Sequence, residues 1–460
     1  MTIISKNADG SITVGEAKGL NGEVHVPGDK SISHRAVMLG SITDGTTRIK
    51  NFLEGEDNLS TINAFRQMGV VITEDGGDLV VTGYGMDSLK EPDDVIDVRN
   101  SGTTARLLTG LFSAQPFFSV ITGDASLRKR PMARVVKPLC LMGAQINGRD
   151  DDRLLPLAIK GGKLKGIKYN SPVASAQLKS AILLAGLYAE GETVVKEPAK
   201  SRDHTELMLK AFGADIKVEG LRITITSKKK LKGLSTILVP GDISSAAFFM
   251  VGAMITPLSE LSLKGRDVTS GVGVNPTRMG IVTILEKMVG SGPIASGLIK
   301  RSDNVVPDND RGLWYEPMST INVTSADCYL KGVDISEEEL LPAIDEFPII
   351  CIAAAFAKGR TVISGAGELR VKESDRIAVM AESLRAVGVT CKEKEDGIII
   401  EGSGGKSIKG GTIDSHGDHR IAMAFAIAGL RAKDGITIKN PECADVSFPG
   451  FYDLLESIAQ

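Results

Sequence analysis

The stretch VPGDKSISHR, at residues 26–35, opens with four residues that recur 213 positions later in VPGDISSAAF, at residues 239–248. Both copies lead into a segment of small and apolar residues whose spacing predicts a helix. Pro and Gly favour a stiff turn at which a chain changes direction. We interpret the two copies as crossings between two domains, with hinges near residues 26–29 and 239–242. A chance recurrence of four residues is the alternative.

One longer pattern recurs six times around these crossings. It consists of a helix of small residues, a short strand, an amphipathic helix and two further strands, as in KSISHRAVMLGSI, TTRIKNF, NLSTINAFRQMG and VVITEDGGDLVVTG of the first copy. Each unit reads β-α-β-α-β-β, and three units precede the second crossing while three follow it. The sixth unit lacks its last strands, and we expect ITVGEAKG, near the N-terminus, to supply them.

The repeat predicts an α/β fold of two domains, residues 27–240 and residues 1–26 plus 241–460. A chain of 460 residues exceeds what one hydrophobic core usually holds. Segments such as LKSAILLAGL and ICIAAAFA are apolar on nearly all sides, so these helices are expected to be buried. Residues 291–334 are rich in Gly, Pro and Asp and are expected to be loops inserted into the fourth unit.

Composition excludes several classes of protein. The net charge of −3 gives no basic face for nucleic acid. Five widely spaced cysteines without a CxxC pair argue against a zinc site or a disulfide framework. The apolar runs fall short of the roughly 18 residues that a membrane span requires, and the start of the chain lacks the features of a targeting segment. We therefore expect a cytoplasmic protein without a metal.

Charged and hydroxyl residues gather where loops lead into helices. Lys30 and Arg35 flank one such start, and the unpaired N–H groups of a helix N-terminus favour anions. In RNSGTT, Gly102 lets a ligand approach the backbone. Further cations stand at other helix starts: Arg130, before a Pro expected to begin a helix, and Arg202, Lys372, Arg376 and Arg420. Taken singly, each cluster also fits a capped helix or a surface salt bridge.

Together these groups predict a site for two anionic small molecules in a cleft between the domains. Two carboxylates, Asp345 and Glu373, lie among the cations in the sequence. They are candidates for acid/base chemistry because dense positive charge alters the proton affinity of a carboxylate.

Eight motifs resemble the 5-enolpyruvylshikimate-3-phosphate (EPSP) synthase family over the whole chain: PGDKSISHR, NSGTTARL, RKRPM, SAQLKSA, SRDHTE, DEFP, RVKESDR and GDHRIAMA. The resemblance implies an inside-out α/β barrel of two domains, each with three βαβαββ units, that closes on its substrates. It implies a monomer without cofactors that joins shikimate-3-phosphate and phosphoenolpyruvate and releases phosphate, on the route to chorismate and the aromatic amino acids. Glu368, Arg202 and Val446 depart from the better-known branch and suggest a second branch.

The same resemblance implies roles for individual residues. Shikimate-3-phosphate would be held by Lys30, Ser31, Arg35, Ser175, Ala176, Gln177, Arg202, Asp345 and Lys372. Phosphoenolpyruvate would be held by Lys30, Asn100, Gly102, Thr103, Arg130, Gln177, Arg376 and Arg420. Asp345 would accept the proton of the 5-hydroxyl, and Glu373, with Lys30, would protonate the methylene carbon to give a tetrahedral intermediate. Because Gly102 leaves the phosphoenolpyruvate pocket open, glyphosate is expected to compete there.

Two rival functions remain to be weighed. The UDP-N-acetylglucosamine enolpyruvyl transferases share the implied fold, but they typically carry a Cys on a mobile loop, and SLRKRPMAR contains none. A catalytically silent anion-binding protein, or a scaffold in a pathway assembly, would not require Asp345 and Glu373 among the cations.

Overall fold

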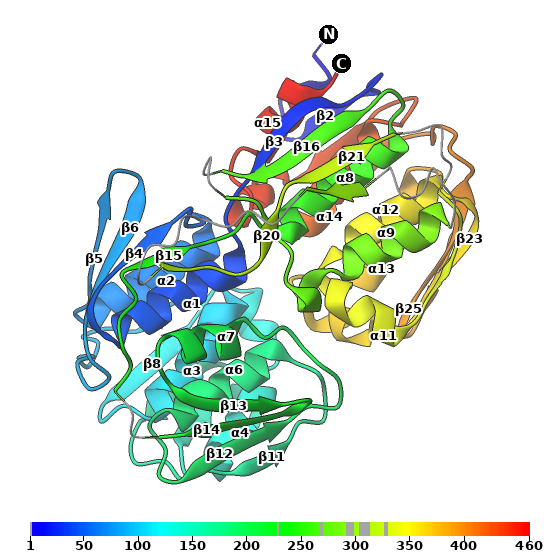
Figure 1. Ribbon diagram of the computed structural model, residues 1–460. Coiled ribbons are helices and arrows are strands. Elements are labelled where there is room, and N and C mark those ends of the chain that lie inside the picture. Colours follow the sequence, from blue (N-terminus) through cyan, green and yellow to red (C-terminus); the bar gives the residue numbers. More distant parts are fainter. Residues whose placement is uncertain (1, 228–229, 267–269, 291–298, 303–312, 326–329) are drawn as a thin grey trace. The chain divides into compact units, whose positions relative to one another are not determined.

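The computed structural model describes residues 2–227, 230–266, 270–290, 299–302, 313–325 and 330–460. The chain forms two compact units (Figure 1). Unit 1 combines Met1–Gly28 with Pro240–Pro307 and Glu316–Gln460, and unit 2 combines Asp29–Val239 with Asp308–Tyr315. Within the described ranges, no helix is long and apolar enough to cross a membrane.

Unit 2 contains three sheets and the helices that pack on them. The sheets have the strand orders β19-β15-β4-β6-β5, β7-β8-β10-β9 and β11-β12-β14-β13. The strands are β4 (Asp44–Lys50), β5 (Val71–Asp75), β6 (Asp78–Tyr84), β7 (Ile96–Asp97), β8 (Phe118–Thr122), β9 (Gln145–Gly148), β10 (Leu154–Lys160), β11 (Lys168–Asn170), β12 (Glu192–Lys196), β13 (Asp215–Glu219), β14 (Arg222–Thr226), β15 (Thr236–Leu238) and β19 (Leu313–Trp314). The helices are α1 (Lys30–Ser41), α2 (Glu56–Gln67), α3 (Gly102–Ser113), α4 (Ala133–Leu141), the short α5 (Arg149–Asp152), α6 (Ala176–Gly186) and α7 (His204–Ala211).

Unit 1 also contains three four-stranded sheets, with the orders β18-β21-β16-β3, β22-β23-β25-β24 and β1-β2-β27-β26, and a two-stranded one, β17-β20. The strands are β1 (Ile4–Lys6), β2 (Ile12–Val14), β3 (Asn21–Val26), β16 (Glu260–Gly265), β17 (Val272–Gly273), β18 (Ile299–Arg301), β20 (Met318–Ser319), β21 (Ile321–Thr324), β22 (Asp334–Ile335), β23 (Lys358–Ile363), β24 (Cys391–Lys394), β25 (Gly397–Ser403), β26 (Gly411–Asp414) and β27 (Ile436–Lys439). The helices are α8 (Ile243–Ile255), α9 (Gly280–Val289), the short α11 (Glu337–Leu340), α12 (Phe347–Phe356), α13 (Arg376–Ala386), α14 (His419–Gly429) and α15 (Phe451–Ile458).

The six larger sheets share one strand arrangement. In each, a parallel pair is extended by two antiparallel strands, as in β7-β8-β10-β9, where β7 is parallel to β8 and β10 is antiparallel to both β8 and β9. The same arrangement holds for the sheet of β22, β23, β25 and β24. A mixed α/β fold built from many small sheets is therefore established.

The two VPGD stretches lie where the chain passes from one unit to the other. Strand β3 pairs with β16 in unit 1, and after Pro27 and Gly28 the chain enters α1 of unit 2. Strand β15 pairs with β4 in unit 2, and the chain then enters α8 of unit 1. The two stretches are neighbours, because Gly28 bridges Gly241 and the amide of Asp242 donates to the carbonyl of Pro27 at 2.8 Å.

The N-terminal strands complete a sheet that begins at the other end of the chain. Strand β2 pairs with β27 in antiparallel register, with Ile12 opposite Ile438, and β1 adds the edge. The amide of Lys18 donates to the carbonyl of Gln460 at 2.7 Å, and the two ends of the chain are drawn close together in Figure 1. The prediction that ITVGEAKG supplies strands to the last unit is confirmed for Ile12–Val14.

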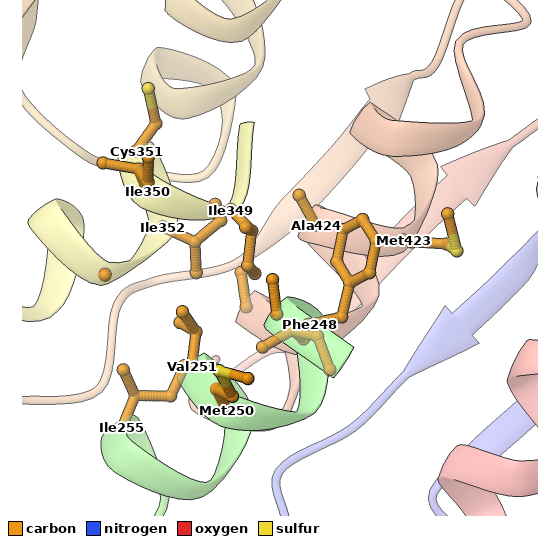
Figure 2. Packing of buried hydrophobic residues seen from close by; sticks show 14 of the residues in the cluster. Phe248, Met250, Val251, Ile255, Ile349, Ile350, Cys351, Ile352, Met423 and Ala424 are labelled. Carbon is orange, nitrogen blue, oxygen red and sulfur yellow. The ribbon is translucent and has the colours of Figure 1, made fainter. Parts of the chain in front are cut away.

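Three apolar helices form the centre of the unit 1 core. Every residue of α8 and α12 is buried, as the sequence predicts for helices that are apolar on all sides. Side chains from α8, α12 and α14 meet around Phe248, Ile349 and Ala424 (Figure 2). Because most of each helix is enclosed in this core, the polar groups of these helices lie chiefly at their N-terminal ends. The N-cap residues there are Asp242, Glu346 and Asp418.

Two local expectations are corrected. Residues 291–334 are not only loops, because β18 and β21 extend one unit 1 sheet and β19 joins the unit 2 sheet beside β15; residues 291–298, 303–312 and 326–329 lie outside the described part. Pro131 does not begin a helix. Leu127–Lys129 forms a 3-10 turn, Arg130 is extended, and α4 starts at Ala133.

Candidate active site

Lys30, the first residue of α1, is held by a carboxylate of the neighbouring helix. Asp29 caps α1 by accepting from the amide of Ile32 at 2.9 Å, which places Lys30 at the helix start. The ammonium lies 2.5 Å from Asp57 Oδ2, and both side chains are largely buried, with 15% and 8% exposed. Asn58 adds a hydrogen bond to the carbonyl of Lys30. The charge of Lys30 is thus fixed rather than free to move with solvent.

Arg35 lies one turn further along α1 and is 5% exposed. Its guanidinium donates to Thr205 Oγ1 at 2.6 Å, to Ser180 Oγ at 2.9 Å and to the carbonyl of Ser31 at 2.8 Å. These three partners are uncharged and come from α1, α6 and α7. They hold the positive charge of Arg35 near the N-terminal ends of these helices, where an anion would be favoured.

The start of α3 forms a second group with α6. Gln177 accepts from Arg106 at 2.9 Å and donates to Thr103 Oγ1 at 3.0 Å. Ser101 caps α3, and Ser175 caps α6. At Gly102 an added Cβ would lie 2.7 Å from a terminal nitrogen of Arg106 and 3.4 Å from one of Arg130, so the glycine makes room for two guanidinium groups.

Arg130 follows the 3-10 turn and is 5% exposed. It donates to the amide oxygen of Asn100, whose nitrogen donates to Asp124 at 2.6 Å. The structure therefore brings together Asn100, Gly102, Thr103, Arg130 and Gln177, all of which the sequence assigns to one ligand. We call these residues, with Lys30, Arg35, Asp57 and Arg106, the unit 2 cluster.

Two buried polar networks support this cluster. Lys179 lies 2.8 Å from Glu197 and 2.7 Å from Glu206, with all three side chains at most 4% exposed. Burial raises the pKa of Glu206, against the lowering effect of Lys179. His34 shares a hydrogen bond of 2.7 Å with Thr61, which contacts Thr104 at 2.7 Å. Burial, followed by Lys30 and Arg35, holds the pKa of His34 well below its usual value, so His34 is neutral.

In unit 1, Arg376 gathers three carboxylates on three different nitrogens. Its Nε lies 2.8 Å from Asp418, one terminal nitrogen lies 2.5 Å from Glu373, and the other lies 3.6 Å from Asp345. Burial disfavours the charge of Arg376, but Asp418, Glu373 and Asp345 outweigh it and raise the pKa of the guanidinium. Asp418 and Asp375 cap α14 and α13, so the helix starts fix the geometry.

Arg420 connects this group to the start of α12. It donates to the carbonyl of Asp345 at 3.0 Å and lies 3.9 Å from the Asp345 carboxylate and 3.8 Å from Glu346. Glu346 also accepts from Ser244 Oγ. Arg278 donates to Ser244 Oγ at 2.7 Å and to Asp242 at 3.2 Å. We call these residues, with Arg376, Glu373 and Asp418, the unit 1 cluster.

The remaining candidates lie at partly exposed positions. Ser31, Ser175, Ala176, Arg202 and Lys372 are half-buried, next to or within the helix starts that the sequence indicates. Within the described residues, no group of three or more His, Cys, Asp and Glu side chains is placed to hold a metal ion.

Sequence reasoning assigned no site role to seven members of the clusters: Asp57, Arg106, Asp242, Ser244, Arg278, Glu346 and Asp418. Asp57 stands in the first turn of an ordinary amphipathic helix, and Arg106 lies inside the apolar stretch TTARLLTG. Arg106 lies one turn after Gly102, on the same face of α3. Arg278 lies in a 3-10 turn, PTR, whose sequence carries no functional signal.

Comparison with known proteins identifies the family of the chain. Residues 14–455 match the family model EPSP synthase (3-phosphoshikimate 1-carboxyvinyltransferase). The 3-phosphoshikimate 1-carboxyvinyltransferases of Geobacter metallireducens and Geobacter sulfurreducens are 55% and 52% identical over 449 residues, covering 98% of this chain and 99% of theirs.

Solved structures give the same result. An EPSP synthase from Acinetobacter baumannii superposes with a TM-score of 0.81 at 49% identity, covering 98% of both chains. The enolpyruvyl transferase NikO from Streptomyces tendae, at 16% identity and a TM-score of 0.74 over 98% of this chain and 97% of its own, shares the fold. The chain therefore belongs to the EPSP synthase family, whose members transfer the enolpyruvyl group of phosphoenolpyruvate to shikimate-3-phosphate.

Proposed function

We propose that both clusters bind the two substrates of the enolpyruvyl transfer and that, apart from the shared Lys30 and Gln177, their residues divide between shikimate-3-phosphate and phosphoenolpyruvate. Shikimate-3-phosphate binds at Lys30, Ser31, Arg35, Ser175, Ala176, Gln177 and Arg202. Asp345 and Lys372 complete its binding site. Phosphoenolpyruvate binds at Lys30, Asn100, Gly102, Thr103, Arg130 and Gln177, and at Arg376 and Arg420. The observation that supports this division is the convergence, within each unit, of cations at helix N-termini.

In the proposed mechanism, Asp345 accepts the proton of the 5-hydroxyl as that oxygen attacks the enol carbon. Glu373, with Lys30, donates a proton to the methylene carbon, which gives a tetrahedral intermediate. The carbon–oxygen bond to phosphate then breaks, and the methyl group returns a proton to the enzyme. Arg130, Arg376 and Arg420 stabilise the negative charge of the departing phosphate, which is the electrostatic contribution to catalysis.

We further propose that the units are the two domains of an inside-out α/β barrel, residues 27–240 and residues 1–26 plus 241–460, each with three βαβαββ units. Hinges near residues 26–29 and 239–242 let the domains close and exclude water. The same proposal includes a monomeric, cytoplasmic enzyme and competition by glyphosate at the phosphoenolpyruvate site. The shared strand arrangement of the six sheets supports the repeat.

The test compares substrates and variants in one assay, the release of phosphate from phosphoenolpyruvate. The wild type should release phosphate with shikimate-3-phosphate and not with UDP-N-acetylglucosamine. Arg202→Ala should raise KM for shikimate-3-phosphate, and Arg420→Lys should raise KM for phosphoenolpyruvate. Equal effects of both variants on both substrates would contradict the division of the site.

A further inference from the structure

Ion pairs in the unit 1 cluster form one continuous chain that contains more carboxylates than cations. Contacts run from Asp242 to Arg278, Glu346, Arg420, Asp345 and Arg376, and from Arg376 to Glu373 and Asp418. Three guanidinium groups therefore face five carboxylates. A group with this balance would repel an anionic ligand unless the carboxylates beside the arginines that bind the ligand are neutralised.

Glu346 is the carboxylate with the least local support. It is 1% exposed, and its Oε2 has no hydrogen-bond partner in the part of the chain that the structure describes. Asp242 and Asp418 each cap a helix by accepting from a backbone amide, whereas Glu346 precedes α12 without a side-chain capping bond. Leaving a buried carboxylate without a cation is costly, so Glu346 depends on nearby arginines.

Two arginines share one oxygen of Glu346. A terminal nitrogen of Arg278 and a terminal nitrogen of Arg420 each lie 3.8 Å from Glu346 Oε1. The side chain of Arg278 is 3% exposed, and that of Arg420 is 11% exposed. Of the two, Arg420 is the one that a ligand reaches more readily.

Arg278 is held in place from several sides. Asn275 caps its 3-10 turn by accepting from Thr277 at 2.8 Å, and Asn275 donates to the buried Glu316 at 2.7 Å. Ser244 accepts from Arg278 and donates to Glu346, which ties the cation to the carboxylate through a hydroxyl. The position of Arg278 is therefore built into unit 1 independently of any substrate.

We propose that Arg278 is a positioning residue for phosphoenolpyruvate: it neutralises Glu346, so that Glu346 does not take Arg420 away from the substrate. This inference rests on the proposed role of Arg420. Without Arg278, Glu346 draws Arg420 into a closer pair, and phosphoenolpyruvate must break that pair to bind. Removal of the Glu346 charge in the same molecule then releases Arg420 again.

The experiment measures KM for both substrates, kcat and the midpoint of thermal unfolding in R278M, E346Q and the double variant R278M/E346Q. R278M should raise KM for phosphoenolpyruvate about 10- to 100-fold, as expected when one partner of a buried charge pair is removed. KM for shikimate-3-phosphate should stay within about twofold, because the described contacts of Arg278 lead to Asp242, Ser244 and Glu346, none of which is a proposed ligand of shikimate-3-phosphate. The double variant should bring KM for phosphoenolpyruvate back to near that of E346Q alone.

Arg431→Met is a matched control, because Arg431 donates to the carbonyl of Ile255 at the opposite end of α8, about 20 Å away for a helix of 13 residues. If Arg278 had only a structural role, R278M would raise KM for both substrates alike, and adding E346Q would raise KM for phosphoenolpyruvate further. Either result, or an unchanged KM in R278M, overturns the proposal. If R278M does not fold, the double variant decides: it should fold and bind phosphoenolpyruvate, and failure to do so overturns the proposal. An unchanged KM in Arg420→Lys would instead reject the proposed site.

Discussion

At the residue scale, the proposed chemistry depends on how Arg376 holds Asp345 and Glu373. The two carboxylates contact different terminal nitrogens, Glu373 at 2.5 Å and Asp345 at 3.6 Å. Glu373 is thus the more tightly paired of the two, and Asp345 also faces Arg420. The two carboxylates occupy different electrostatic environments, as an acid and a base with separate tasks require.

Asp345→Asn and Glu373→Gln should each lower kcat about 10²- to 10⁴-fold, the usual contribution of a general acid or base. Both changes preserve shape, so the thermal midpoint should move little. Steady-state release of phosphate measures the rate. Asp396→Asn serves as the control, because the described contacts of the Asp396 side chain are with the amide of Gly365 and with Lys394. A kcat within threefold of wild type in either variant would reject the assigned role.

Gly102→Ala should weaken the binding of both phosphoenolpyruvate and glyphosate. The new methyl group would lie 2.7 Å from the guanidinium of Arg106, which must shift, and 3.4 Å from that of Arg130, which is ordinary contact. Overpacking of this kind typically costs 1–3 kcal/mol, which corresponds to about tenfold or more in KM and in the inhibition constant. Gly162→Ala is the control, since a Cβ there meets no atom within 4 Å. Tighter binding of either compound would contradict the prediction.

Single residues also mark the limit of what the sequence can predict. Lys30, Arg35 and Arg130 could be proposed as site residues because cations near predicted helix starts stand out in a sequence. Asp57 and Arg106 could not, because each is placed by a contact with another segment, Lys30 for the first and Gln177 for the second. Pairings of this kind are fixed by tertiary packing and leave no local pattern.

At the scale of elements, α6 and α7 are joined by the buried pairing of Lys179 with two glutamates. The folded state binds a proton to Glu206 more tightly than the unfolded state does, because burial raises the pKa of Glu206. The folded state therefore gains stability from Glu206 at low pH and loses it as pH rises from the ordinary value of 4.5 through the raised pKa.

Glu206→Gln should accordingly stabilise the protein at neutral and alkaline pH, by about 1 kcal/mol, because Lys179 retains Glu197 as its partner. The difference in unfolding free energy between variant and wild type should shrink as pH falls toward 4.5. Denaturant unfolding of both proteins at a series of pH values measures this difference in unfolding free energy. A stability difference that grows toward acid pH would show that the sign is wrong.

Elements were easier to predict than their ends. The helices of KSISHRAVMLGSI and ICIAAAFA follow from apolar spacing, and both are found as α1 and α12. Pro131 misled because Pro favours the first turn of a helix, yet here Met132 still separates it from α4. The 3-10 turn before Arg130 uses few residues and has no periodicity to detect.

At the scale of the whole molecule, unit 1 depends on strands from the first 14 residues. Ile12 and Val14 are buried against β27, at 5% and 0% exposed. Deletion of residues 1–14 should destabilise unit 1 by at least about 3 kcal/mol, because two buried aliphatic side chains contribute about 1.5–3 kcal/mol each.

Hydrogen exchange locates the effect of this deletion. The amides of Ile436–Lys439 in β27 should lose protection, while those of β12 in unit 2 should keep it. A variant that lacks only residues 1–3, before β1 begins, is the control. Unchanged protection of β27 would show that β2 contributes nothing to this sheet.

The pairing of strands that lie far apart in the sequence was predictable where a sequence repeat indicated it. The interpretation as six units left the last unit without two strands, and β2 supplies one of them: Val14 pairs with Ile436 of β27, 422 residues later. No repeat predicted β19. This strand, Leu313–Trp314, is two residues long and joins a sheet whose other strands all precede residue 239.

The double crossing at the VPGD stretches has a consequence for biosynthesis. Residues 29–239 leave the ribosome as one block and can collapse around their own core, but β1, β2 and β3 are made first and their partners β27 and β16 come later. At about 5–20 residues per second, β2 waits roughly 20–85 s for β27. Until β27 is made, β2 has an open strand edge, which is a site for binding by chaperones and for premature association.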